Sequence, residues 1–189
     1  MSDSQPTVIR IKKGADGRSA LSCTRADGTT TWQSLKGGQA AFYPRHDLTH
    51  YAVETVLGQR KGFYGLVAAG WDLTDFGTPW PRGKLPPDAN LSELIVGFFD
   101  HERASGELGT VDELNDNIAT FCAEYGAPPR DTCTAEELAR VRKKRAELFA
   151  QWDSVKPGDA LELVFEVEPD DAGPTASSSR NRPTSAKSR

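Results

Sequence analysis

Two Asp-Gly dipeptides, at positions 16–17 and 27–28, divide the N-terminal part of the chain into three short runs of β-prone residues. Asp-Gly adopts the positive φ angles of tight hairpin turns, so each dipeptide predicts a reversal between neighbouring strands. In the first run, Ile9 and Ile11 would share one face of a sheet. The runs predict an antiparallel β-meander with strands at 8–12, 20–23 and 29–32.

Two helices are predicted after the glycines at 37 and 38. The first covers 44–57, because Pro44 suits a first helical turn and Gly58 a helix end. The second covers 62–71 and is apolar nearly all round, which indicates a buried helix. Its small residues form a stripe that would let another backbone approach closely: Gly62, Gly65 and Ala69.

Three further helices have readable starts, each followed by apolar residues at helical spacing. Four prolines within 72–89 predict an irregular loop before them, and its aromatic residues Phe76 and Trp80 suggest that the loop packs over something. The helix starts resemble capping boxes, the first with Asn in the cap position, at 90–93, 110–113 and 134–137.

Residues 161–167 alternate between apolar and polar and predict a final strand that could join the meander. From 169 to 189 the chain is polar without periodicity, which predicts a disordered tail. We therefore expect one α+β domain over residues 1–168. It would consist of the antiparallel meander, completed by the last strand, with about five helices packed against it.

Composition excludes several classes of protein. The net charge of −4 gives no general attraction to nucleic acid or anionic membrane, and the basic run 140–145 is interpreted as a solvated helix face. The three cysteines form no Cys-x-x-Cys pair, and no apolar run approaches 18 residues. The polar N-terminus lacks a signal peptide, so we expect a cytoplasmic protein with neither a nucleic-acid nor a membrane partner. A small-molecule ligand and the oligomeric state are left open.

The predicted helix 44–57 holds two of the three histidines in the chain. His46, His50 and Glu54 fall at i, i+4 and i+8, and each step of four residues turns only about 40°, so they share one stripe. Val53 and Leu57 lie on the same side of the helix. Imidazoles facing apolar neighbours need hydrogen-bond partners or a metal ion, because an unsatisfied buried polar group is costly.

This spacing is typical of a divalent-metal site. His46 and His50 are separated by about 6 Å along the helix axis, the usual span for two ligands of one ion. Glu54 lies about 12 Å from His46 along the axis, so it is either a crowded third ligand or an acceptor that holds the tautomer of His50. His101 is another candidate third ligand. Imidazole and carboxylate ligands suit zinc and iron alike.

Asp47 stands where Glu stands in the His-Glu-x-x-His metalloproteases, in which that Glu is the general base acting on metal-bound water. A carboxylate in a first helical turn is also favoured by the helix dipole alone. Our leading hypothesis is a divalent-metal-binding protein, either a metal-dependent hydrolase or an oxygenase-like enzyme, with Asp47 as its catalytic residue. The rival is a non-catalytic binding or interaction protein whose histidine helix satisfies a buried polar network.

The run from His46 to Glu54, His-Asp-Leu-Thr-His-Tyr-Ala-Val-Glu, resembles an uncharacterised family of small bacterial proteins with an HDLxHYAVE segment. The likeness extends over residues 40–77, including the glycine-rich part of 62–71, and implies no known activity. The chain is also similar to the coenzyme-Q biosynthesis scaffold family, whose His-Asp-x-x-His motif is associated with zinc. His46, Asp47 and His50 match that motif. Its distal Glu would fall at position 62, which is Gly here, so neither the third ligand nor the function carries over.

Overall fold

The protein is described by a computed structural model that defines residues 6–125 and 133–166. In chain order the elements are β1 (Thr7–Lys13), β2 (Ser19–Thr24), β3 (Thr30–Leu35), α1 (Gly38–Val56), α2 (Phe63–Ala68), the 3-10 turn η1 (Leu73–Phe76), α3 (Pro87–Ser105), α4 (Val111–Tyr125), α5 (Ala135–Ser154) and β4 (Ala160–Phe165). The predicted α+β class is confirmed. The tail predicted to be disordered lies outside the described residues.

The four strands form one antiparallel sheet in the order β3-β2-β1-β4. Both Asp-Gly turns have the expected positive φ, 78° at Gly17 and 82° at Gly28. Ile9 pairs with Cys23 on one side and with Leu163 on the other, and it is fully buried. The last strand therefore completes the meander as predicted, and strict alternation places one face of the sheet under the helices.

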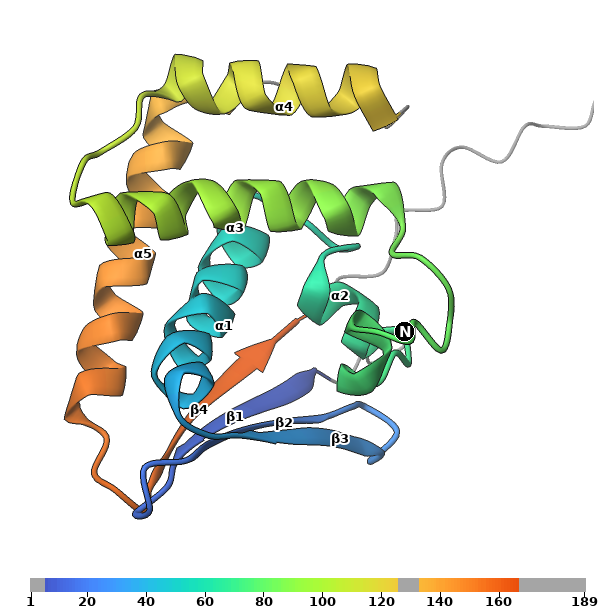
Figure 1. Ribbon diagram of the computed structural model, residues 1–189, viewed down its shortest axis with the longest axis vertical. Coiled ribbons are helices and arrows are strands. Elements are labelled where there is room, and N and C mark those ends of the chain that lie inside the picture. The colour runs from blue at the N-terminus through green and yellow to red at the C-terminus, as the bar shows by residue number, and fades with distance from the viewer. Residues whose placement is uncertain (1–5, 126–132, 167–189) are drawn as a thin grey trace, which may run out of the picture.

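The helices lie on one side of this sheet in the described part of the chain (Figure 1). Helix α1 contacts β2 below it and α3 and α5 beside it, so it is the central element of the core. Helix α4 packs on the far side of α3. None of these helices combines the length and the apolar character that crossing a membrane requires.

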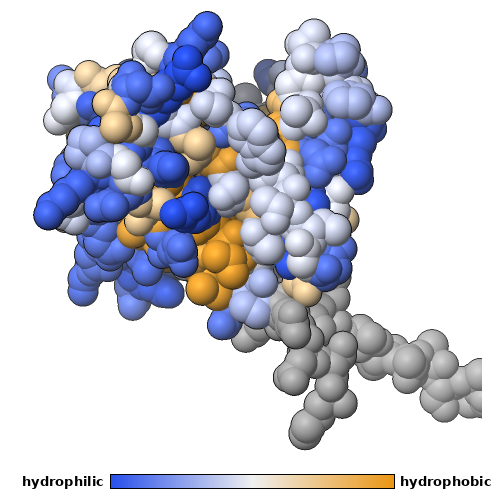
Figure 2. Space-filling view, turned by 90° about the horizontal axis from the view of Figure 1, so that it is seen from below, coloured by the Kyte–Doolittle hydropathy of each residue, from blue (hydrophilic) through white to orange (hydrophobic). Residues whose placement is uncertain are grey.

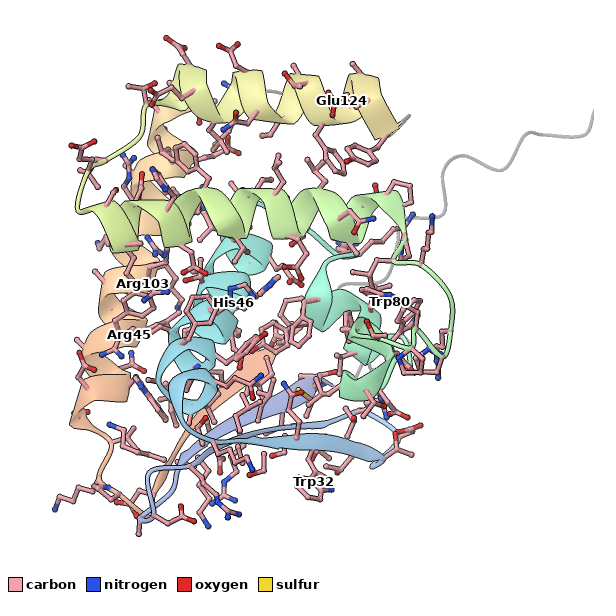
Figure 3. The ribbon with its side chains drawn as sticks, in the orientation of Figure 1. Trp32, Arg45, His46, Trp80, Arg103 and Glu124 are labelled. Atoms are coloured by element: carbon pink, nitrogen blue, oxygen red, sulfur yellow. The ribbon has the colours of Figure 1, made fainter. Side chains whose placement is uncertain are left out.

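The outer face of the sheet carries several exposed apolar side chains. Val8 and Val164 are opposite each other in the β1–β4 ladder, and Trp32 on β3 is 66% exposed. Viewed from below the sheet, apolar side chains gather near the centre of this face among hydrophilic ones (Figure 2). Trp32 points away from the helices (Figure 3), so it is remote from the helical core.

Two helix starts differ from the prediction, and a proline is involved in each. Helix α1 begins at Gly38, so Pro44 lies inside it, where its missing N–H leaves one carbonyl without an intrahelical partner. Helix α3 begins at Pro87, not at Asn90, because a proline with its fixed φ fits the first helical position. The Asn90 side chain donates instead to the Leu85 carbonyl, 3.2 Å away. Glu93 is therefore in the second turn of α3 and is not a capping residue.

The other two capping boxes are confirmed. In α4 and α5 the cap threonine and the glutamate three residues later bond each other's backbone N–H, as at Thr134 and Glu137. Replacing Thr134 with Ala is expected to lower the free energy of unfolding by about 1 kcal/mol, because the cap hydrogen bond is lost. Urea denaturation measures this. Thr120→Ala, at an exposed position inside α4, is the matched control and should not destabilise the protein.

The basic run 140–145 is not a uniformly solvated face, which corrects that interpretation. Arg145 is only 7% exposed and donates to the Phe99 carbonyl at 2.8 Å. Arg142 donates to the Glu102 carboxylate and to the Gly109 carbonyl. These two arginines therefore connect α5 to α3, and both lie within ion-pair distance of the buried Glu102 carboxylate.

Candidate metal centre

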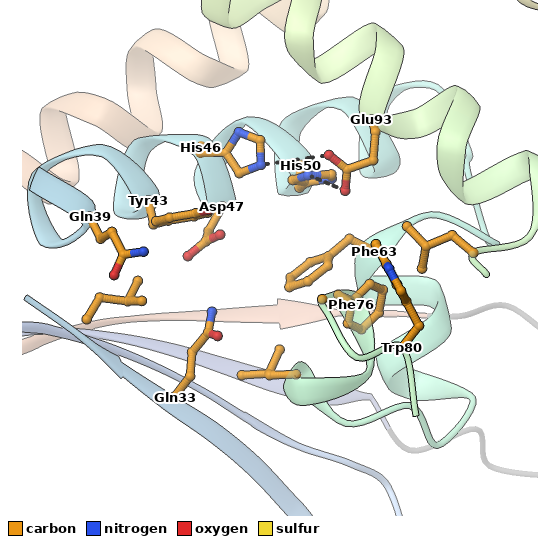
Figure 4. Close-up of a pocket in the computed structure, with 14 residues that line it drawn as sticks. Gln33, Gln39, Tyr43, His46, Asp47, His50, Phe63, Phe76, Trp80 and Glu93 are labelled. Atoms are coloured by element: carbon orange, nitrogen blue, oxygen red, sulfur yellow. Dashed lines mark ion pairs between the residues drawn. The ribbon is translucent and has the colours of Figure 1, made fainter. Parts of the chain in front are cut away.

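A cavity of about 470 Å³ opens beside the histidines of α1. Its walls come from α1, the end of β3, the start of α3 and the segment from Phe63 to Leu85 (Figure 4). Phe76 and Trp80, from the loop expected to pack over something, form part of the wall. The functional residues therefore come from parts of the chain that are distant in sequence.

His46, His50 and Glu93 converge at the top of this cavity. His50 Nε2 lies 3.3 Å from Glu93 Oε1, and His46 Nε2 lies 3.9 Å from Glu93 Oε2. One ligand atom from each of the three residues lies within 4.8 Å of the others. Neighbouring turns of α1 carry the imidazoles, and α3 crosses above them and brings the carboxylate (Figures 3 and 4).

The second nitrogen of each imidazole faces a different carboxylate. His46 Nδ1 is 2.7 Å from Asp100 Oδ2, and His50 Nδ1 is 3.2 Å from Glu54 Oε1. A carboxylate at Nδ1 favours the tautomer that carries its proton there, so in the neutral ring the Nε2 lone pair is available to bind a cation. Both rings are thus oriented in the same way, with Nε2 directed toward Glu93.

Glu54 is itself held by the backbone of α2. Its Oε2 accepts from the N–H groups of Tyr64 at 3.0 Å and Gly65 at 3.2 Å. The close approach depends on Gly62, because a Cβ at that position would lie 2.5 Å from Glu54 Cδ. Gly62, one member of the predicted stripe of small residues, therefore lets the start of α2 reach this carboxylate, and Glu54 orients His50 from behind.

The spacing of the ligand atoms is compatible with a single metal ion. Zinc binds nitrogen and oxygen ligands at roughly 2.0–2.2 Å, so two ligands of one ion are about 3.3 Å apart. The two Nε2-to-Glu93 separations, 3.3 and 3.9 Å, are close to that value. The cavity side is open and could admit water or substrate as a fourth ligand. His46, His50 and Glu93 could therefore hold an ion of the zinc type.

The charges of the centre are strongly coupled. Burial lowers the pKa of His50, but the carboxylates of Glu54 and Glu93 overcome this effect and raise it to about 10. Burial likewise acts to raise the pKa of Glu93, whereas its hydrogen bond to His50 and the positive charge of that ring hold it below its usual value. Four carboxylates surround two imidazoles: Asp47, Glu54, Glu93 and Asp100. This arrangement favours a bound cation.

Asp47 points into the cavity beside the histidines (Figure 4) and is only 3% exposed. Burial raises the pKa of its carboxyl to about 7, although His46 and His50 act to lower it. Within residues 6–125 and 133–166, no group donates a hydrogen bond to this carboxylate; the Tyr64 hydroxyl bonds the Asp47 backbone carbonyl instead. An unpartnered carboxylate with a pKa near neutrality can accept and release protons.

The structure brings most of the predicted site residues together. His46, Asp47 and His50 line the cavity, and Glu54 lies behind His50. His101 is exposed on α3 and lies outside the group of converging ligands.

Sequence reasoning missed Glu93 as a ligand and Asp100 as the partner of His46. The two carboxylates are seven residues apart, so they lie on the same side of α3. Glu93 was interpreted as a cap residue. The signal that could have found the pair is this spacing of two carboxylates beside the apolar stripe of a helix.

No family model, curated protein or solved structure matches the chain. The function proposed below therefore rests on the geometry and charges of this centre.

Proposed function

We propose that this protein is a metal-dependent hydrolase with a single zinc ion held by His46, His50 and Glu93. The observation that carries the proposal is the matched orientation of the two imidazoles. Each ring directs Nδ1 to an outer carboxylate and Nε2 to Glu93, the arrangement that zinc-ligating histidines share. Two histidines and a glutamate, with an open fourth position, are the ligand set of one group of catalytic zinc sites.

Asp47 favours hydrolysis over oxygenase chemistry. Iron accepts the same ligands, so the ligand set alone does not choose between the two reactions. A bound zinc ion would act as a Lewis acid and increase the acidity of a water molecule. Asp47 faces the cavity with no hydrogen bond to its carboxylate from described residues, so it is available to take up a proton from that water.

Elemental analysis of the purified protein tests the metal. We expect about one equivalent of zinc, and a melting temperature that falls when a chelator removes it, because the ion compensates the buried carboxylates. One equivalent of iron in place of zinc would favour the oxygenase alternative. Absence of stoichiometric metal, with a melting temperature unchanged by the chelator, would favour the non-catalytic interaction protein.

Asp47→Asn tests the hydrolytic role. With 4-nitrophenyl acetate as a general ester probe, the zinc-loaded protein should release nitrophenolate, and the variant should be slower by about 100-fold or more. Zinc content should stay at one equivalent, because Asp47 is not a ligand in this proposal. Equal rates for the two proteins would remove Asp47 from the mechanism.

A further inference from the structure

The cavity next to the metal centre has an aromatic wall. Phe63 and Phe76 lie with ring centroids 4.6 Å apart, and Trp80 from the loop lies beside them (Figure 4). Tyr43 on α1 lines the opposite side of the cavity, next to Asp47. Faces of aromatic rings carry negative potential, so grouped rings attract cations, above all organic ammonium ions that are easily desolvated.

The acidic side chains in the cavity wall would attract a cation, as the faces of the aromatic rings do. Asp47 and Glu93 are its acidic residues, and none of the described residues that line it is Lys or Arg. Two arginines elsewhere in the described structure are paired with acidic residues, Arg82 with Asp75 and Arg103 with Asp100. Without a metal, His50 is a cation of the lining, and it is already paired with Glu54 and Glu93, so it is not available to compensate an anionic ligand.

A bound metal would not reverse this balance. A divalent ion adds two positive charges, whereas four carboxylates surround the centre. With neutral imidazoles, all four carboxylates ionised and the Arg103 partner of Asp100 included, the sum is +2 + 1 − 4 = −1. The low dielectric of a half-enclosed site strengthens the effect of that excess on a ligand.

We propose that the cavity binds an organic ammonium ion, and that this cation is the substrate on which the metal centre acts. The inference rests on the proposed function for the reaction, but its ligand class rests on the aromatic wall and the carboxylates alone. The ammonium group would lie against Phe63, Phe76 and Trp80, with Asp47 as its nearest unpartnered countercharge. Gln33 and Gln39, whose amides face the same space (Figure 4), would bind the polar remainder of the molecule.

Three probes that share a benzyl group test the ligand class: benzyltrimethylammonium, benzyl alcohol and phenylacetate. Their charges, positive, neutral and negative, do not change near pH 8. Binding to the full chain is measured by titration calorimetry, with and without zinc. The decisive comparison is made without zinc, because a carboxylate can ligate zinc by itself. We expect the cation to bind at least about tenfold more tightly than the other two.

Two tryptophan variants locate the binding. Trp80→Leu should weaken binding of benzyltrimethylammonium at least about tenfold. Trp32→Leu, the matched control on the outer face of the sheet, should leave it unchanged. Equal or tighter binding of benzyl alcohol or phenylacetate, no binding of any probe, or an unchanged affinity in Trp80→Leu would each overturn the inference.

These results also separate the two proposals. Cation binding that depends on Trp80, in a protein that takes up no zinc, would keep the ligand class and reject the hydrolase. Zinc binding without cation selectivity would reject the ligand class and leave the proposed hydrolase standing.

Discussion

Replacing Glu93 with Gln is expected to lower the affinity for zinc by more than roughly 100-fold. This loss is larger than the one expected when a residue that only hydrogen-bonds to a metal ligand is replaced. The amide keeps the size of the side chain but removes the negative charge, and it coordinates zinc poorly. The carboxylate oxygens of Glu93 lie 3.3 and 3.9 Å from the two imidazole nitrogens, so no other described residue can replace them at this position. Competition with a chromophoric chelator measures the affinity.

His101→Gln is the matched control, because the sequence suggests His101 as the third ligand and the structure leaves it exposed. It should leave zinc affinity unchanged. Glu54→Gln, which weakens the acceptor at His50 Nδ1, should fall between the two, with a loss of roughly 10- to 100-fold. Unchanged zinc affinity in Glu93→Gln, or a large loss in His101→Gln, would contradict the ligand set.

Gly65→Ala is expected to be among the most destabilising single-methyl additions in the protein. A Cβ at this position would lie 1.9 Å from the Arg60 carbonyl oxygen, a backbone atom that cannot turn away. Overpacking of this kind costs about 1–3 kcal/mol or more. The Gly65 N–H also donates to Glu54, so a shift of α2 would disturb the support of His50. Urea denaturation should show a free energy of unfolding lowered by at least about 2 kcal/mol.

Gly97→Ala is the control for the same chemical change. Gly97 is exposed in the middle of α3, and no atom lies within 4 Å of the position of its Cβ. Alanine there should stabilise the protein by up to about 1 kcal/mol, because it restricts the unfolded chain and favours the helix. Similar effects of the two substitutions would show that α2 does not approach the Arg60 backbone as closely as described.

Much of the fold follows from local rules. The β-meander depends on two Asp-Gly turns and on alternation, and the starts of α4 and α5 depend on capping boxes that involve four consecutive residues each. The start of α1 was misplaced because Pro44, a residue typical of first helical turns, lies inside the helix. At α3, the Asn90 cap pattern competed with Pro87, and the proline was the true start.

The same contrast holds for the candidate site. His46, His50 and Glu54 lie on one helix, so the helical period by itself places them on a common stripe facing apolar neighbours. Helical rise also indicated that Glu54 is too far along the axis to be an easy ligand, and it lies behind His50. Asp47, next to His46 in the chain, lines the same cavity.

Glu93 and Asp100 belong to another helix, and no local rule states how far α3 lies from α1 or at what angle it crosses. Those quantities depend on side-chain packing between the helices and on the Arg145 and Glu102 network that joins α5 to α3. The sequence by itself thus determined the three-stranded meander, the starts of α4 and α5 and the histidine stripe, because these depend on residues within one or two turns. Only the tertiary structure decided that a carboxylate from α3 meets both imidazoles, because that contact joins residues more than forty positions apart.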